Sequence, residues 1–260
     1  MGLALREHLG RALLVALALS SLAMKVPPPH TYGRVVLDNF STRAGVPPAA
    51  FDHWRHRAKF TCRLCHVDVG FAMEERATKV SAATNRSGFH CGACHNGRTK
   101  HAGKPIFAAC SDSRRLEDAC RRCHVQEDEA KLLKEYEAFA ARLPRRPLGG
   151  VDWESAEERR LVAPVDFLEG ASVSRRRLQM EHDVAIASRG WMTDVKFSHK
   201  KHAVWNGCEV CHPEIFPSTK RGEVKYSMLE IDAGRYCGAC HMKVAFHVAE
   251  CERCHRERVQ

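Results

Sequence analysis

The residues best suited to chemistry in this chain are cysteines followed by histidines. Twelve of its thirteen cysteines fall into six Cys-x-x-Cys-His motifs. Two thiols and an adjacent imidazole at this spacing are typical of c-type haem attachment, in which the thiols bond to the porphyrin and the histidine binds the iron. The motif residues are Cys62, Cys65 and His66; Cys91, Cys94 and His95; Cys120, Cys123 and His124; Cys208, Cys211 and His212; Cys237, Cys240 and His241; and Cys251, Cys254 and His255.

Two other kinds of structure also use paired cysteines. Cys-x-x-Cys pairs build structural zinc sites, and small exported domains often carry a disulfide framework. Neither requires a histidine directly after the second cysteine in all six motifs. The repeated histidine therefore favours haem over zinc or disulfides, and it predicts six covalently bound c-type haems.

The N-terminus has the character of an export signal. Arg6 and Arg11 precede an apolar run that ends at Ala23. This run is shorter than the roughly 20 residues that a membrane-spanning helix needs. Small residues, Ser21 and Ala23, lie where a signal peptidase would cut. Residues 1–23 are predicted to be a signal peptide, with a retained anchor as the alternative. The mature protein is then expected to be periplasmic or otherwise exported, without a transmembrane span.

The charge of the polypeptide suggests anionic partners only while the haems are left out. The formal net charge is +10 with neutral histidines, which by itself favours nucleic acid or an anionic surface. A ferric haem core carries one positive charge and its propionates two negative ones, so six haems would add about −6 when oxidised and about −12 when reduced. The holoprotein would be near neutral. This argues against nucleic-acid binding and favours pairing of the basic residues with propionates and partner proteins.

The composition also predicts how the chain folds. Only 7% of residues are aromatic, and much of the chain between the motifs is polar, so the polypeptide alone has little apolar surface to bury. Large planar cofactors would supply that surface, as metals do in small metal-dependent domains. We expect a mostly irregular chain with short α-helices and minimal β structure, largely unfolded without haem. Phe107 and Phe246 are expected to pack on haem edges.

The six motifs form two groups of three that are copies of one unit. A shift of 146 residues aligns residues 51–95 with residues 197–241 without a gap. Both copies contain the pattern Phe-x-His-x-x-His ahead of the first motif. Before the third motif the copies differ, because the first has the longer segment, Asn96–Ala119, and the second only Met242–Glu250. An internal duplication of this kind predicts two structural units.

The Phe-x-His-x-x-His pattern followed by three haem motifs resembles the class III multihaem cytochromes, and most closely their compact three-haem, c-seven type, which also occurs in tandem arrays. The resemblance covers roughly residues 51–124 and 197–255. It implies two haem-packed class III cytochrome-like units in tandem. The predicted domains are a first three-haem unit with a C-terminal helix at 24–143, and a second three-haem unit at 197–260.

The elements that position these motifs are expected to be short. Residues 126–143 have the apolar spacing of an amphipathic helix, with acidic residues in the first turn. Pro144 ends this helix and opens a linker and lead-in segment at 144–196. Short strands are expected within 32–40 and at 194–197, leading into each repeat, and the haem motifs are expected to lie on short helices.

Each iron needs a second axial ligand or an open site, and histidines three residues apart are the first candidates. His53 and His56, like His199 and His202, lie close enough on a helical turn for each to serve a different haem. The resemblance implies that the first histidine binds the first haem of its unit and the second histidine the second haem. The implied pairs are His53 with His66, His56 with His95, His199 with His212, and His202 with His241.

The third haem of the second unit has no histidine between the first two motifs. Met228 lies in that interval, where some tandem members of the resembling family use methionine. Met228 is therefore predicted to bind the iron of His255. His247 is the competing ligand, and an ordinary buried methionine is the other alternative.

The third haem of the first unit lacks even this methionine, because Ala82 occupies the matching position. Met73 is predicted to bind the iron of His124, ahead of His90 and His101. A methionine ligand raises the haem potential relative to two histidines. At least one haem in each unit is therefore expected to have a distinct potential.

These features favour an exported electron carrier over an enzyme. Six redox centres on one chain suit haem-to-haem transfer between partners, here other cytochromes or a membrane quinol-oxidising complex of anaerobic respiration, which dock through small charge-steered contacts. Two alternatives stay open: a multihaem reductase with an open haem site, and a structural subunit of a larger cytochrome assembly. Against the reductase, no motif has lysine in place of its histidine, and no additional catalytic domain is evident.

Overall fold

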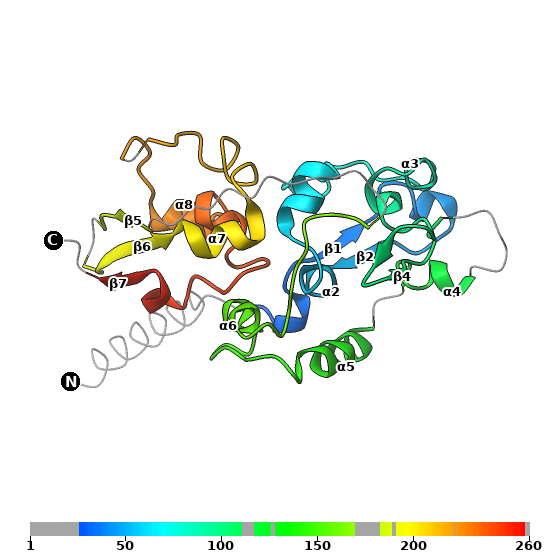
Figure 1. Cartoon of the computed structure of the whole chain (residues 1–260), viewed down its shortest axis with the longest axis horizontal. Helices are drawn as coiled ribbons and strands as arrows, with labels where there is room; N and C mark the ends of the chain where they lie inside the picture. Colours follow the sequence, from blue (N-terminus) through cyan, green and yellow to red (C-terminus); the bar gives the residue numbers. More distant parts are fainter. Residues whose placement is uncertain are drawn as a thin grey trace, which may run out of the picture.

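The two repeats lie at opposite ends of an elongated molecule (Figure 1). The computed structural model describes residues 26–110, 117–125, 128–169, 183–188, 191–220 and 222–257. The predicted signal peptide, and the first two residues of the predicted helix at 126–143, lie outside the described residues.

Regular structure is sparse and short, which confirms the predicted fold class of a mostly irregular chain. The helices are α2 (His53–Arg57), α3 (Ala82–Arg86), α4 (Glu117–Cys120), α5 (Glu129–Ala140), α6 (Trp153–Glu158), α7 (His199–Asn206) and α8 (Met228–Asp232). The strands are β1 (Arg34–Leu37), β2 (Ala49–Asp52), β3 (Lys100–His101), β4 (Lys104–Pro105), β5 (Asp183–Ile186), β6 (Asp194–Ser198) and β7 (His255–Glu257). Single turns of 3-10 helix lie at Pro29–Thr31, Thr42–Ala44, His90–Ala93, Tyr236–Ala239 and Cys251–Arg253, and a π-helical turn lies at Leu64–Asp68.

Each repeat begins on a pair of antiparallel strands. β1 pairs with β2, with Val35 opposite Phe51, and β5 pairs with β6, with Val184 opposite Phe197. The second strand of each pair runs directly into the helix that carries two histidines, α2 or α7. Both strands predicted to lead into the repeats are therefore present, as β1 and β6.

The third motif of each repeat returns to the start of the same strand pair. His124 forms a bridge with Ala49, and His255 in β7 pairs with Val195. Ala49 and Val195 are 146 residues apart, whereas the two third motifs are only 131 residues apart. The longer segment of the first copy is therefore accommodated before its third motif, and the motif still reaches the equivalent place.

Serine caps at matched positions begin the short helices of both repeats. The Ser81 side chain accepts a hydrogen bond from the Thr84 backbone N–H at the start of α3, and Ser227 accepts one from Glu230 at the start of α8. Helices of five residues are not stable by themselves, because nucleation costs more than so few hydrogen bonds return. Caps and the surrounding packing therefore hold α3 and α8 in place.

The helix predicted at 126–143 is α5, which ends three residues earlier than expected. Asp128 caps its N-terminus by accepting a hydrogen bond from the Lys131 backbone N–H. Its apolar face, Leu132, Tyr136 and Ala140, packs with Trp54 of α2. The helix thus covers the element that carries the first histidine pair.

The chain after Pro144, predicted as a linker and lead-in, folds back along the first repeat. Val165 forms a bridge with Phe60, and Glu169 forms one with Lys100. Leu168 completes a buried cluster with Phe60 and Leu64. This part of the chain therefore packs on the first repeat before the second one begins.

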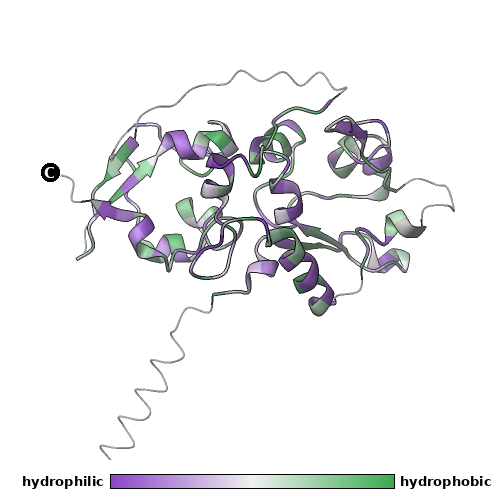
Figure 2. Ribbon diagram, turned by 60° about the horizontal axis from the view of Figure 1, so that its bottom comes forward, coloured by the Kyte–Doolittle hydropathy of each residue, from purple (hydrophilic) through white to green (hydrophobic). Residues whose placement is uncertain are grey.

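Hydrophobic stretches alternate with polar ones along the described part of the ribbon (Figure 2). Three small clusters of buried side chains take the place of one large core in the described part of the molecule. None of the helices among these residues has both the length and the apolar character that crossing a membrane requires. All thirteen cysteines lie in the described ranges, and none of them forms a disulfide.

Candidate haem-binding site

Tight turns bring four of the six motif histidines back toward the first cysteine of their motif. The backbone N–H of the histidine donates to the carbonyl of that cysteine in four motifs, at 2.8 Å for His95 and His124, 2.9 Å for His212 and 3.0 Å for His241. The motifs of His95 and His241 lie on matched 3-10 turns. This backbone closure gathers two thiols and one imidazole around a single location.

The middle glycine of two motifs is required by close packing. A Cβ atom on Gly92 would lie 1.8 Å from the carbonyl oxygen of Asn85, and one on Gly238 would lie 1.9 Å from that of Ile231. Since real Cβ atoms do not approach so closely, only glycine fits against the ends of α3 and α8. The repeated Cys-Gly-Ala-Cys-His sequence therefore reflects how the second motif of each repeat docks on the preceding helix.

Backbone carbonyls orient the motif imidazoles. An imidazole nitrogen that faces a carbonyl oxygen must carry the proton, so Nδ1 donates and Nε2 keeps its lone pair for a metal. Such second contacts normally accompany histidines that bind metals. The Nδ1 contacts are His66 to Phe71 at 2.9 Å, His124 to Pro47 at 2.7 Å, His212 to Phe216 at 2.8 Å, His241 to Phe246 at 3.1 Å and His255 to Thr193 at 2.6 Å.

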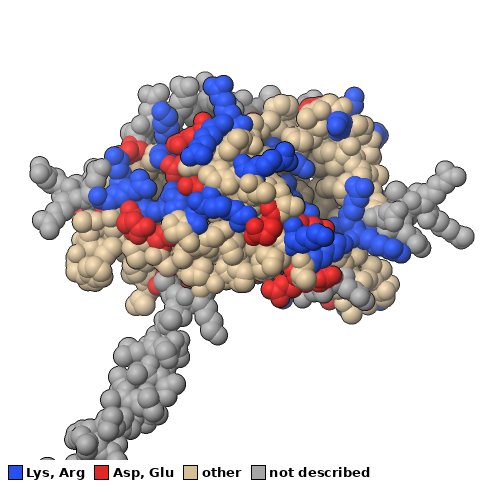
Figure 3. Space-filling model, turned by 90° about the horizontal axis from the view of Figure 1, so that it is seen from below, with Lys and Arg blue, Asp and Glu red and all other residues tan. Residues whose placement is uncertain are grey.

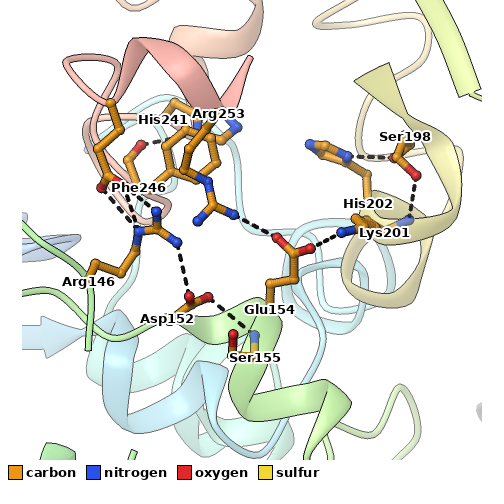
Figure 4. A network of polar contacts seen from close by, with 11 residues as sticks. Arg146, Asp152, Glu154, Ser155, Ser198, Lys201, His202, His241, Phe246 and Arg253 are labelled. Carbon is orange, nitrogen blue, oxygen red and sulfur yellow. Dashed lines mark hydrogen bonds and ion pairs between the residues drawn. The ribbon is translucent and has the colours of Figure 1, made fainter. Parts of the chain in front are cut away.

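Three of the four histidines on α2 and α7 have the same orientation. Nδ1 of His53 faces the Gly33 carbonyl, Nδ1 of His56 lies 3.3 Å from the Asp52 carbonyl, and Nδ1 of His202 lies 2.8 Å from the Ser198 carbonyl (Figure 4). Their Nε2 atoms are therefore the nitrogens with a free lone pair. The first turn of each helix supplies an imidazole in the form that binds iron.

Three of the four implied histidine pairs face each other across the same separation. A metal ion bound at about 2.0 Å by imidazoles on opposite sides would hold their ring centroids roughly 6.4 Å apart, since each nitrogen lies about 1.2 Å from its ring centroid. A tetrahedral zinc site would not place two ligands opposite each other. The observed centroid separations are 6.3 Å for His53–His66, 6.3 Å for His56–His95 and 6.3 Å for His202–His241.

The planes of the facing rings differ between pairs. His53 and His66 are nearly parallel, at 4°, whereas His56 and His95 lie at 70° and their counterparts His202 and His241 at 60°. The second pair of each repeat thus keeps its geometry through the duplication. The fourth implied pair, His199 with His212, stays a prediction.

Aromatic rings support the same histidines in both repeats. Phe51 touches His53 edge-on at 4.8 Å and lies 4.4 Å from His56, and Phe197 repeats these contacts at 4.8 Å from His199 and 4.3 Å from His202. This explains why phenylalanine begins the Phe-x-His-x-x-His pattern. Phe107 and Phe246 contact motif imidazoles. The Phe107 ring lies 4.4 Å from that of His95, and the Phe246 ring lies 4.3 Å from that of His241.

Burial keeps these imidazoles neutral. It lowers the pKa of His56 and of His241 to about 4, and it lowers the pKa of His53, His66, His95 and His202 as well. Because the neutral imidazole is the form that binds a metal, the environment favours ligation over protonation.

The surroundings of several buried motif thiols also favour their neutral form. Burial, with a smaller contribution from neighbouring thiols, raises the pKa of Cys65, Cys91 and Cys240 to about 12, and that of Cys211 and Cys237 to about 11. A zinc site would need these sulfurs as thiolates. The surroundings suit uncharged thioethers, so the donor set fits c-type haem.

The residues predicted for the third haems are placed less decisively. Met228 is the first residue of α8 and is 47% exposed, and Met73 is half-buried in an irregular segment. His90 lies 5.4 Å from Phe71, and His101 lies 4.9 Å from Phe60. The ligands opposite His124 and His255 stay predictions.

His247 differs from the ligand-type histidines. It is buried, and its Nδ1 accepts a hydrogen bond from the Ala249 backbone N–H at 3.1 Å. In a neutral ring the proton is then on Nε2, so this nitrogen has no lone pair to offer. The contact argues against His247 as the competitor of Met228.

The carbonyls of Gly33, Pro47 and Thr193 are parts of the site that sequence reasoning missed. They lie ahead of the repeats, in or beside the segments that lead into them. A backbone carbonyl has no residue type that would reveal it. The strands expected at 32–40 and 194–197 were the available indication that these segments approach the histidines.

Paired buried thiols and facing neutral imidazoles, repeated along one chain, define a multihaem c-type cytochrome. The chain belongs to the family described as cytochrome c7 and related cytochrome c, whose profile matches residues 49–125 and 195–256, more than half of the chain. Proteins of this class carry covalently bound haems and transfer electrons. The predicted resemblance to tandem three-haem cytochromes is thereby confirmed.

Solved cytochrome structures were also found to be similar. A c7-type three-heme cytochrome domain is 34% identical and covers 31% of this chain and 99% of its own length, with a TM-score of 0.27. The C-terminal hexaheme fragment of GSU1996 is 23% identical over 86% of this chain and 98% of its own, also with a TM-score of 0.27. The dodecaheme cytochrome c GSU1996 is 19% identical and covers 87% of this chain and 75% of its own length, again with a TM-score of 0.27. Among curated proteins, none matches the chain.

Proposed function

We propose that this protein is an exported six-haem electron carrier and not an enzyme. One haem is attached at each Cys-x-x-Cys-His motif. The first two haems of each unit have two histidine ligands, in the pairs that the sequence implies. The third haems pair His124 with Met73, and His255 with Met228. The observation that carries this proposal is the set of three imidazole pairs facing each other at 6.3 Å.

When bound, haem supplies an iron that takes up and releases one electron. The chain's own residues set the conditions for this. Backbone carbonyls fix the orientation of the imidazoles, burial keeps the imidazoles neutral, and Phe51 and Phe197 hold both histidines of a helix in place. An iron with two firmly held ligands has no position for a substrate, which supports a carrier.

Close spacing of the attachment sites supports passage of electrons along the chain. Besides burial, Cys94 and Cys91 raise the pKa of Cys65, and Cys123 raises that of Cys91, so the three motifs of the first unit are neighbours. Cys62 likewise raises the pKa of Cys240 and of Cys211 in the second unit. The first motif of one unit therefore faces two motifs of the other.

The partners we propose are other cytochromes or a membrane quinol-oxidising complex. The basic N-terminal residues followed by an apolar run support export. On the face shown in Figure 3, Lys and Arg side chains form a broad band with Asp and Glu among them. Mixed charge of this kind suits transient docking steered by electrostatics.

The test is to purify the exported holoprotein and measure its intact mass, its haem content and its redox titration. The proposal predicts the polypeptide without residues 1–23, plus six haem masses, and reversible reduction by six electrons. A mass with fewer haems, or cysteines that alkylating reagents still modify within the motifs, would contradict it.

A further inference from the structure

A cavity lies where the two repeats meet, beside one of the predicted iron ligands. Tyr32, His53, Trp54 and Arg57 of the first unit form one side, and Val244 and Glu250 of the second unit form the other. Gly33 approaches Val244 so closely that a Cβ atom there would lie 2.6 Å from its side chain. The two units therefore enclose this space together.

Three buried hydrogen-bond donors on the wall of this cavity have no acceptor among the described residues. They are Oη of Tyr32, Nε1 of Trp54 and Nε of Arg57. A buried donor without a partner costs roughly 1–3 kcal/mol, so native proteins rarely leave one unpaired. Three such donors around one cavity indicate an acceptor group that the polypeptide itself does not supply.

Arg57 carries a charge that no carboxylate among the described residues compensates. Its Nη1 donates to the Val244 carbonyl, and its guanidinium lies 4.8 Å from the ring centroids of both Trp153 and Trp205. No carboxylate in the described part of the chain forms an ion pair with it. Burial lowers the pKa of Arg57, and only the thiols of Cys62 and Cys240 act against this. As haem thioethers these sulfurs would carry no charge.

The acidic residues around the cavity already have partners. Glu250 binds the guanidinium of Arg146, which also lies 3.1 Å from Asp152 (Figure 4). Glu154 binds Arg253 at 2.7 Å and also contacts Lys201. The buried cation must therefore find its anion elsewhere, because an unpaired charge in the interior is strongly unfavourable.

We propose that a propionate carboxylate of the haem attached at Cys62 and Cys65 occupies this cavity, with Arg57 as its charge partner and Tyr32 and Trp54 as further donors. A carboxylate only accepts hydrogen bonds, which matches the three donors that have no partner. The cavity is lined by His53, the predicted ligand of that haem, so this haem reaches the wall. The inference rests on the haem that the proposed function places at this motif.

The consequence is a haem whose potential depends on the junction between the units. A cation beside the propionate favours the extra electron of the reduced state and so raises the midpoint potential. Loss of Arg57 should therefore lower the potential of one haem. The indoles of Trp153 and Trp205, which meet edge to face with their ring centroids 6.3 Å apart, come from the intervening segment and from the second unit, so the contact also joins the repeats.

The experiment compares Arg57→Gln with Arg55→Gln in the full holoprotein. Arg55 lies two residues away in α2, but it is exposed by 39% and bonded to Asp52 at 3.0 Å and to Glu135. Intact mass first establishes that the wild type and both variants carry six haems. Each protein is then titrated potentiometrically, and the propionate bending band is recorded by resonance Raman spectroscopy.

The proposal expects Arg57→Gln to lower one midpoint potential and to shift one component of the propionate band, while Arg55→Gln changes neither. An unchanged propionate band would overturn the proposal even if a midpoint potential changed. Arg57 would then influence the haem through space, and the cavity would hold water and no propionate. A wild type lacking haem at Cys62 would instead contradict the proposed function.

Two further variants keep the test decisive. If Arg57→Gln does not yield a protein with all its haems, Tyr32→Phe takes its place, because it removes only a hydroxyl. This variant must shift the same propionate band by a smaller amount. No shift would overturn the proposal. The source of the propionate is tested in a His53→Met background, where methionine raises and separates the potential of that haem. Arg57→Gln must then shift the midpoint potential of that haem. A shift in the midpoint potential of another haem alone would assign the carboxylate to that other haem and overturn the assignment.

Discussion

Trp54 in the first repeat and Lys200 in the second occupy the same position, directly after the first histidine of the pair. Trp54 is 5% exposed and lies 5.6 Å from the ring of Tyr136 and 4.8 Å from that of Phe139, both in α5. Lys200 is exposed, and no helix equivalent to α5 covers it in the described part of the chain. Yet His56 and His202 face their motif partners at the same 6.3 Å.

The contrast extends to the whole core. Ten of the twelve buried hydrophobic side chains described precede residue 170, and the second repeat contributes only Trp205 and Val210. Trp205 itself packs on Ala156 and Val162 of the preceding segment. The same ligand geometry is thus built with a protein core in one repeat and almost without one in the other. In the second repeat the haems must provide most of the buried surface.

The largest expected difference follows from removing one haem in each repeat. Cys237→Ala with Cys240→Ala should make the second repeat open to proteases, with cleavage there faster by about tenfold or more, since the open population rises. The matched change, Cys91→Ala with Cys94→Ala, should leave the region around α5 resistant. Limited proteolysis with mass mapping checks both. Equal protection of the two repeats would remove the contrast.

Removal of an axial histidine should act alike in both repeats. His56→Ala and His202→Ala each take away one of two facing ligands, so each variant should gain one haem that binds carbon monoxide when reduced. Absorption difference spectra measure this. His247→Ala is the control, since the hydrogen bond at its Nδ1 argues against it as a ligand, and a carbon monoxide complex in that variant would contradict this assignment.

Trp54→Ala against Lys200→Ala sharpens the difference in packing. Deleting a buried tryptophan costs about 3–5 kcal/mol. An exposed substitution such as Lys200→Ala stays within roughly 0.5 kcal/mol. Because a multihaem protein does not unfold in two states, regional hydrogen exchange is the suitable measurement. Faster exchange in α2 and α5 is expected for Trp54→Ala only, and similar profiles for both variants would show that α5 does not support the site.

The smallest expected effect concerns the third haems. Met228→Leu and Met73→Leu conserve volume, so each should cost less than about 1.5 kcal/mol in stability. Each should remove one methionine–iron bond and lower one midpoint potential or open one haem. Spectroelectrochemistry checks this, with Met192→Leu as the control. If only Met228→Leu has an effect, the two units differ in their third ligand, and His90 becomes the ligand to test in the first.

The sequence was sufficient for much of this architecture. The shift of 146 residues, the histidine pairs and the strands leading into the repeats could be predicted because each repeats or has a characteristic residue pattern. The carbonyls of Pro47 and Thr193 could not, since any residue supplies a carbonyl. The packing of Val165 and Leu168 on the first repeat was also missed, because the short apolar stretch there has no helical or strand period.

The role of Arg57 could not be predicted from the sequence either. In the sequence it is one of 41 basic residues, and nothing distinguishes it from Arg55. Only the fold shows that Arg55 has carboxylate partners, whereas Arg57 lies beside two indoles without one. Burial and partner, which decide what a charged residue does, depend on contacts between distant parts of the chain.

Carbon monoxide binding to the reduced wild-type holoprotein tests the central claim most directly. Carbon monoxide needs an open or weakly held sixth position on the iron. If every iron has two firm ligands, as a carrier requires, the absorption spectrum stays unchanged. If one or two haems bind carbon monoxide rapidly, the ligands opposite His124 or His255 are absent or labile, the carrier account fails at those haems, and a reductase becomes the function to pursue.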